Sequence, residues 1–232
     1  MTRRTVLSVA ALQVLRAQVV KPLRLPRKLR VGIWGLQGHT GEITGPALPD
    51  IEIAAVADAY QKPSGRLASY PFYKDPREML AREKLDIVAV CNNNGQRAGA
   101  ILECIQRRLN VIAEKPLALT REDLGKIKRA VSDSGIKLGM LLPMRFDPPY
   151  LALRKIVDDG LIGEVAQIAS QKSYKAGVRE DWYKKRATYG GSIAWIGIHM
   201  IDLMRFTSGR EFRETAGLRA TWPSPNSAKW RM

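Results

Sequence analysis

The chain has 232 residues, of which 45% are hydrophobic, and it carries a formal net charge of +16. That length suffices for one large domain or two small ones with a buried core. No apolar run approaches the roughly 20 residues of a membrane-spanning helix, so membrane insertion is excluded. The two cysteines, Cys91 and Cys104, give no disulfide framework, and we expect both to be buried small apolar residues.

The positive charge is concentrated at the N-terminus. Residues 1–30 contain eight Arg or Lys residues and no acid, which accounts for half of the excess. The remaining clusters, at 107–108 and 184–186, are more typical of solvated faces than of phosphate contacts. We therefore expect no nucleic-acid partner, although a nucleic-acid-binding α/β module remains an alternative that rests on charge alone.

The first seventeen residues, "MTRRTVLSVAALQVLRA", resemble a twin-arginine export signal, with paired arginines before a short apolar stretch. Arg16 interrupts the expected cleavage region, so an uncleaved basic extension is equally compatible with the sequence. Both the bacterial cytoplasm and the periplasm stay open as locations. We treat residues 1–29 as leader and linker, because Pro22 and Pro26 prevent a long helix.

From Arg30 onward, apolar strands alternate with helical patterns. Strands are expected at 30–35, 51–58, 85–91, 110–116 and 136–143, and helices at 76–84, 96–108 and 120–135. Continuous apolar strands are typical of a parallel sheet that is buried on both faces. Thr120 is the expected N-cap of the last helix, and Gly135 lies past its end. The alternation predicts an α/β fold, a Rossmann doubly wound parallel sheet over residues 30–145.

The pattern changes near Arg145. A helix over 147–163, a strand over 164–175 and an amphipathic helix over 190–209 are expected. They predict a partial α+β domain over 146–232, the start of a half-exposed sheet. Only about two dozen residues follow Gly209, which is too few for the several further strands that such a sheet needs.

A glycine-rich turn follows the first expected strand and contains Gly35, Gly38 and Gly41. Its spacing is G-x-x-G-x-x-G rather than the strict G-x-G-x-x-G of dinucleotide-binding turns. Asp58 ends the second strand, where a carboxylate accepts hydrogen bonds from the adenosine ribose hydroxyls. That carboxylate would repel a 2′-phosphate, so NAD is expected in preference to NADP. The alternatives are a ligand-free glycine turn and an aspartate that caps a helix.

Two further residues could carry chemistry. Lys115 ends the strand "NVIAEKP" on the same carboxyl edge of the sheet, where the nicotinamide would lie. His199 shares one helix face with Asp202, and a histidine can exchange a proton during oxidation of an alcohol. A lone helix histidine is more often structural. The other histidine, His39, is better suited to contact with cofactor or solvent, and no residue cluster has metal-ligand spacing.

From about Leu29 to Arg213 the chain resembles the glucose–fructose oxidoreductase, inositol dehydrogenase and rhizopine-catabolism (Gfo/Idh/MocA) family. The resemblance rests on six segments: "VGIWGLQGHTG", "VADA", "FYKDPREML", "AEKPLALT", "MRFDPPY" and "GGSIAWIGIHMIDLMRFTSG". It implies an N-terminal Rossmann domain, a C-terminal open-faced antiparallel sheet that serves substrate binding or oligomerisation, and homo-oligomers. It also implies NAD(P)-linked oxidation or reduction of sugars, inositols or related polyols.

The resemblance implies roles for individual residues. Lys115 and His199 would be catalytic, and together with Asp202 they would bind substrate. The cofactor residues would be Gly35, Gly38, Gly41, Asp58, Asn92, Asn93, Glu114, Lys115 and Arg145. Two positions depart from the family pattern. Trp195 stands where an aspartate is common. The strand-end segment here is "CNNNGQR", whereas the family segment often contains Thr-Pro followed by a histidine. A non-catalytic dinucleotide-binding protein or a degenerate family fragment is therefore the alternative function.

Overall fold

A computed structural model describes residues 24–45, 48–173, 177 and 179–217. Most of the expected leader, residues 1–23, lies outside this part of the chain, so the export prediction stays untested. The chain divides into two compact units. The first, which we call the sheet unit, comprises the described residues 24–45, 48–141, 177 and 179–195. The second, the helical unit, is formed by the described residues 142–173 and 196–217. Each unit is described by itself.

The sheet unit is built on a six-stranded sheet in the order β3-β2-β1-β4-β5-β6, with every neighbouring pair parallel. Its strands are β1 (Leu29–Trp34), β2 (Ile51–Ala57), β3 (Phe72–Tyr73), β4 (Ile87–Val90), β5 (Asn110–Ala113) and β6 (Leu138–Met140). This is the Rossmann strand order, in which the chain reverses direction across the sheet between β1 and β4. The prediction of a doubly wound parallel sheet is confirmed.

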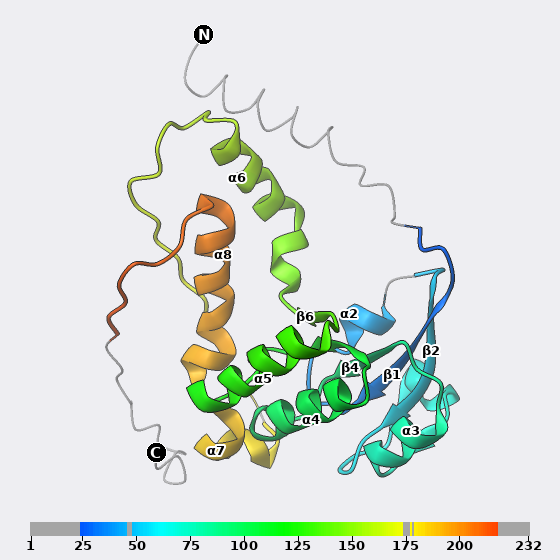
Figure 1. The fold of residues 1–232 in the computed structure, drawn as a ribbon. Coiled ribbons are helices and arrows are strands. Elements are labelled where there is room, and N and C mark those ends of the chain that lie inside the picture. Colours follow the sequence, from blue (N-terminus) through cyan, green and yellow to red (C-terminus); the bar gives the residue numbers. More distant parts are fainter. Residues whose placement is uncertain (1–23, 46–47, 174–176, 178, 218–232) are drawn as a thin grey trace. The chain divides into compact units, whose positions relative to one another are not determined.

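Helices cover both faces of this sheet (Figure 1). One face packs against α3 (Pro76–Arg82), α4 (Asn94–Gln106) and α5 (Arg121–Ser134), with Met79, Ile101 and Ile127 in the shared core. The other face packs against the short helix α2 (Gly41–Thr44) and the 3-10 turn Gly65–Ser69. Burial on both faces explains why the strands are continuous apolar runs.

Three helices of the sheet unit begin with a polar cap directly after the strand loops. The side chains of Asp75, Asn93 and Thr120 each accept a hydrogen bond from a backbone N–H in the first turn of α3, α4 and α5. The predicted cap at Thr120 is confirmed, as is the stop at Gly135, which adopts a left-handed conformation with φ of 70°. Because each helix follows a parallel strand, these caps collect at the carboxyl edge of the sheet.

The sheet unit also contains a later segment that packs against the start of α4. The 3-10 turn Asp181–Lys184 and α7 (Arg186–Tyr189) belong to it, and the Asn94 amide donates to the Tyr189 carbonyl at 2.7 Å. A π-helical turn, Ile193–Gly197, follows and leads into α8 (Ile198–Ser208). Residues 179–195 therefore border the carboxyl edge of the sheet, although they lie far from it in sequence.

The helical unit contains α6 (Pro148–Asp158) and α8, which lie side by side (Figure 1). The strand expected over 164–175 is wrong, because the structure forms no strand between 164 and 173. The described part of this unit contains no strand with which this segment could pair. A single strand would leave its backbone N–H and C=O groups without inter-strand hydrogen bonds.

None of the helices in the described ranges is both long and apolar enough to cross a bilayer. Cys91 and Cys104 are fully buried and free, as expected. Burial raises the pKa of each thiol to about 12, which keeps both protonated at neutral pH. Neither cysteine is therefore available as a thiolate nucleophile.

Candidate functional site

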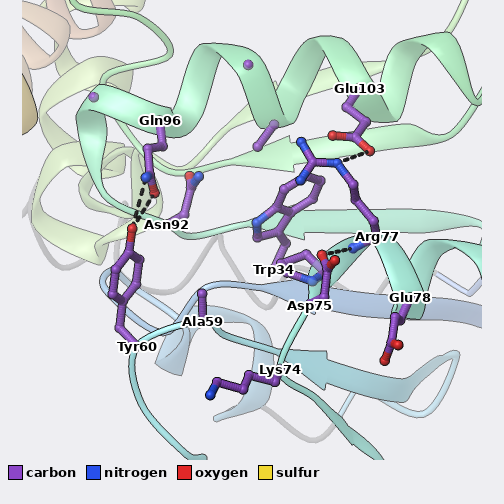
Figure 2. A pocket seen from close by; sticks show the side chains of 14 residues that line it. Trp34, Ala59, Tyr60, Lys74, Asp75, Arg77, Glu78, Asn92, Gln96 and Glu103 are labelled. Carbon is purple, nitrogen blue, oxygen red and sulfur yellow. Dashed lines mark hydrogen bonds and ion pairs between the residues drawn. The ribbon is translucent and has the colours of Figure 1, made fainter.

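A cavity of about 750 Å³ opens at the carboxyl edge of the sheet unit (Figure 2). Its lining comes from the ends of β1, β2 and β4 and from the starts of α3 and α4, and includes Trp34, Tyr60, Asp75, Asn92 and Gln96. Two hydrogen bonds join Tyr60 and Gln96 across one side of it. The Tyr60 hydroxyl donates to Gln96 Oε1 at 3.2 Å and accepts from Gln96 Nε2 at 2.9 Å. The cavity lies at the reversal of strand order, where doubly wound folds bind ligands.

The glycine turn beside this cavity is packed closely against two neighbouring strand ends. Gly35 has φ of 91°, and a Cβ there would lie 2.5 Å from the backbone of Asn92. A Cβ on Gly38 would collide with the side chain of Glu114. Gly41 instead begins α2, and a Cβ there would meet no atom within 4 Å. The tight approach of the turn thus depends on Gly35 and Gly38.

Asp58 lies just after β2 and is almost completely buried, with 3% of its surface exposed. Its Oδ2 accepts hydrogen bonds from the Leu36 N–H at 2.8 Å and from the side-chain amide of Gln37 at 2.6 Å. Its Oδ1 accepts from the N–H groups of Tyr60 at 2.7 Å and Gln61 at 2.9 Å. A carboxylate has about four acceptor sites, so the chain itself fills the acceptor capacity of Asp58.

Glu114 is fully buried beneath the glycine turn. It accepts hydrogen bonds from the His39 N–H at 2.8 Å and the Lys115 N–H at 2.5 Å, and its Oε1 also pairs with the His39 ring. Burial would raise the pKa of this carboxyl, but the bonds and charge of His39 and the charge of Lys115 outweigh it and hold the pKa below its usual value. Glu114 therefore ties the turn to the end of β5.

Lys115 is 2% exposed, and its ammonium group is held within the sheet unit. Nζ donates to the Trp195 carbonyl at 2.8 Å and lies 3.2 Å from the centre of the Trp195 ring. Trp195 makes edge contacts with Trp182 and Tyr183, at centroid distances of 5.6 and 5.7 Å. The residue that departs from the family pattern thus forms a cation–π contact with the predicted catalytic lysine.

Arg97 is a site residue that the sequence analysis missed. It is fully buried, and its guanidinium donates to Asn94 Oδ1 at 2.7 Å and to the carbonyls of Lys115 at 3.0 Å and Pro116 at 3.1 Å. A further bond reaches the Asn92 carbonyl. Burial lowers the pKa of this guanidinium to about 10, so it stays charged at neutral pH. The sequence signal is "CNNNGQR", because a buried cation on α4 requires acceptor groups and three asparagines precede Arg97.

The two predicted asparagines have different surroundings. Asn92 is 5% exposed and lines the cavity, and its Oδ1 has no hydrogen-bond partner in the described part of the protein. Asn93 caps α4, accepting from the Gln96 N–H at 3.2 Å and donating to Gln96 Oε1 at 2.9 Å. A buried acceptor without a donor is costly, so a donor group in the cavity would satisfy Asn92.

The remaining predicted residues belong to the helical unit. Arg145 donates through Nε to Asp202 Oδ2 at 2.7 Å, and its Nη2 pairs with Oδ1. This bond, with the charge of Asp202, raises the pKa of Arg145 above its usual value. His199 and Asp202 are each 5% exposed and lie one helical turn apart on α8. The structure thus brings Arg145 to Asp202, a pairing that the sequence did not predict.

The residues of the sheet unit fit an adenine dinucleotide. The turn at Gly35 leaves no room for a Cβ, and Asp58 stands at the end of β2. The Asn92 carbonyl oxygen, which has no hydrogen-bond partner among the described residues, could accept from an amino or hydroxyl group of such a ligand. Polar acceptors of this kind, in a cavity at the switch point, match the chemistry of a nucleotide.

Comparison with known proteins agrees with this geometry. Residues 29–141 match the model of an oxidoreductase family described as having an NAD-binding Rossmann fold. Residues 150–228 match the GFO/IDH/MocA C-terminal domain. Asp58 led us to expect NAD as the cofactor. The match of residues 29–141 to an NAD-binding family model confirms this expectation.

Individual relatives point the same way. The chain is 30% identical to inositol 2-dehydrogenase of Rhizobium meliloti over 79% of this chain and 56% of that protein. It is also 30% identical to D-glucoside 3-dehydrogenase of Escherichia coli, over 69% of this chain and 47% of that one. A solved Thermotoga maritima structure, assigned as an oxidoreductase, superimposes with a TM-score of 0.73 at 31% identity. It covers 79% of this chain and 60% of that chain.

The chain spans about half the length of the curated relatives that it matches. The two matched family models together span residues 29–141 and 150–228 of the chain. With a Rossmann sheet in the order 3-2-1-4-5-6 and a nucleotide-compatible carboxyl edge, the chain belongs to the Gfo/Idh/MocA family of oxidoreductases.

Proposed function

We propose that this protein is an NAD-dependent oxidoreductase that transfers a hydride to or from a sugar, an inositol or a related polyol. The observation that carries the proposal is the common position of Lys115, Asp58 and the glycine turn. All three follow parallel strands and meet at one edge of the sheet unit. The similarity to inositol and glucoside dehydrogenases supports a CH–OH substrate.

The sheet unit would hold the cofactor. The turn from Gly35 to Gly38 would face the pyrophosphate, and Asp58 would accept from the adenosine ribose hydroxyls. Asn92, Asn93 and Glu114 would line the cleft, and Arg145 would approach the nicotinamide. The bound cofactor supplies a hydride acceptor or donor at the nicotinamide C4.

The substrate step would use two side chains. The Lys115 ammonium would hydrogen-bond the reacting oxygen and stabilise the negative charge that grows there as the hydroxyl proton leaves during oxidation, or as hydride adds to the carbonyl carbon during reduction. An imidazole nitrogen of His199 would take the hydroxyl proton during oxidation and return it during reduction. Asp202 would contribute to substrate binding on the same face of α8.

One experiment tests both halves of this proposal. NAD affinity is measured by calorimetry for the unaltered chain and for Asp58→Ala, and turnover is followed across a panel of inositols and sugars. We expect micromolar NAD binding that weakens at least tenfold in Asp58→Ala. We also expect turnover that is lost in Lys115→Ala but kept in Lys62→Ala, which changes an exposed lysine.

The outcomes separate the two functions considered from the sequence. Tight NAD binding without turnover of any polyol would select the non-catalytic dinucleotide-binding protein. Millimolar or absent NAD binding would contradict both. The named dehydrogenase activity of the relatives favours the oxidoreductase.

We also propose that the protein forms a homo-oligomer. The helical unit exposes several large apolar side chains, including Phe146 at 76% and Leu161 at 56%, which association would cover. Size-exclusion chromatography with light scattering tests this, and a monomeric mass at micromolar concentration would contradict it. Residence in the cytoplasm or the periplasm depends on the segment 1–17 and stays a prediction.

A further inference from the structure

Gln37 stands at the centre of the glycine turn, where a dinucleotide-binding loop needs space. In the G-x-G-x-x-G pattern the second glycine lets the backbone approach the pyrophosphate. Counted from Gly35, that position is Gln37. Its side chain is not directed into solvent, because only 7% of the residue is exposed. A five-atom side chain is thus packed into the place that this pattern keeps free.

One hydrogen bond holds the backbone of Gln37, and another holds its side chain. Its backbone N–H donates to the Cys91 carbonyl at 3.0 Å, and its Nε2 donates to Asp58 Oδ2 at 2.6 Å. Its Oε1 has no hydrogen-bond partner in the described part of the chain. Gln37 also lines a second cavity of about 340 Å³, together with Tyr60, Asn93 and Trp182.

This arrangement opposes dinucleotide binding in two ways. Asp58 already accepts four N–H groups, so a ribose hydroxyl finds no acceptor until one donor leaves. Three of those donors are backbone groups fixed by the fold, and only the Gln37 amide belongs to a rotatable side chain. The Gln37 carbonyl oxygen, with no donor of its own, would also repel phosphate oxygens that pass the turn.

We propose that Gln37 is a latch on the cofactor cleft, and that its side chain must rotate away from Asp58 before NAD binds. The inference rests on the proposed NAD-dependent function. Rotation frees Asp58 Oδ2 to accept a ribose hydroxyl and allows the Gln37 amide N–H to donate to a pyrophosphate oxygen. Gln37 therefore sets the affinity for the dinucleotide, although it contacts no reacting atom.

Calorimetric titrations of NAD and of adenosine into the full chain test the latch, using Gln37→Gly and Gln37→Met. Gln37→Gly frees both Asp58 and the phosphate path, so we expect it to bind both ligands about tenfold more tightly. Gln37→Met frees Asp58 but keeps the side-chain volume. It should tighten adenosine binding similarly and leave NAD binding unchanged or weaker.

Gln61→Ala serves as the matched control, because this exposed glutamine donates to Asp58 through its backbone N–H, which the substitution keeps. It should leave both affinities unchanged. Far-ultraviolet circular dichroism and melting curves verify that each variant is folded. Equal or weaker NAD binding by folded Gln37→Gly overturns the latch while leaving the proposed function intact. Absence of NAD binding in every variant and in the unaltered chain overturns both.

Discussion

The two units of the protein bury their apolar side chains to very different degrees. Among the described residues, nearly all buried apolar side chains belong to the sheet unit, and the helical unit contributes only Leu142 and Leu203. Large apolar side chains of the helical unit that remain exposed are Phe146, Leu153, Leu161, Ile162, Ile168, Ile201 and Phe212. Similar apolar content therefore gives a closed core in one unit and an open surface in the other.

The two units also differ in how far each buries an arginine side chain and in how many acceptors surround it. Arg97 of the sheet unit is surrounded by protein and donates to four oxygen atoms. Arg145 of the helical unit keeps 36% of its side chain exposed and pairs with a single carboxylate, that of Asp202. Where parallel strands end, their following loops offer free backbone carbonyls, and Arg97 donates to three of them. In a pair of packed helices most backbone carbonyls are already bonded within the helix, so Arg145 depends on a side chain.

The largest expected effect follows removal of the buried cation. Arg97→Met should lower the free energy of unfolding by about 3–5 kcal/mol, because several buried carbonyl acceptors lose their donor. Arg145→Met should cost about 1–3 kcal/mol, because Asp202 loses its partner but solvent reaches the site. Urea denaturation followed by circular dichroism measures both. A smaller loss for Arg97→Met than for Arg145→Met would contradict the contrast.

An Ile→Ala substitution in each unit compares how much a buried and an exposed isoleucine contribute to the free energy of unfolding. Ile101 of α4 is completely buried, and Ile201 of α8 is 42% exposed. Ile101→Ala should lower the free energy of unfolding by about 2–5 kcal/mol through lost burial and a cavity. Ile201→Ala should cost less than about 1 kcal/mol. If both variants unfold at the same urea concentration, then α8 is covered in solution, and the open surface of the helical unit is occupied.

The smallest expected effect concerns acid stability of the sheet unit. Asp86 accepts hydrogen bonds from the Arg27 guanidinium and the Arg30 N–H, and these lower the pKa of its carboxyl from 3.8 to about 2. A depressed pKa in the folded state adds stability above the unfolded value. This stability should disappear as the pH falls from about 4 to about 2.

Asp86→Asn isolates this contribution, because it keeps the shape of the side chain and removes its charge. The variant should be less stable than the unaltered protein at pH 6 but show a shallower loss of unfolding free energy below pH 4. Chemical denaturation at a series of pH values measures both slopes. Identical slopes for the two chains would show that Asp86 does not contribute to the acid transition.

The regular elements of the sheet unit were predictable from local patterns. Apolar runs predicted five of the six strands and missed the two-residue β3, and Thr120 with Gly135 marked both ends of α5. Asp58 and Lys115 were predicted to lie at one edge because each comes just after a strand, and parallel strands end at one edge. The strand expected over 164–175 failed, because a strand needs a partner that no local pattern supplies.

Other features depended on groups that meet only after folding. Gln37 and Asp58 are 21 residues apart, and Arg97 and Pro116 are 19 apart, yet their hydrogen bonds define the carboxyl edge. Trp195 lies 80 residues from the lysine that it contacts. No periodicity or composition encodes such pairs.

Chain order and the spacing of apolar, glycine and capping residues were enough to specify a Rossmann sheet and the edge at which its ligand belongs, since both follow from local backbone preferences. Folding alone decided which polar groups share that edge. Whether Asp58 accepts from a ribose or from Gln37, and whether Lys115 meets a substrate or Trp195, depends on distances between segments remote in sequence. The energy of a hydrogen bond is set by those distances.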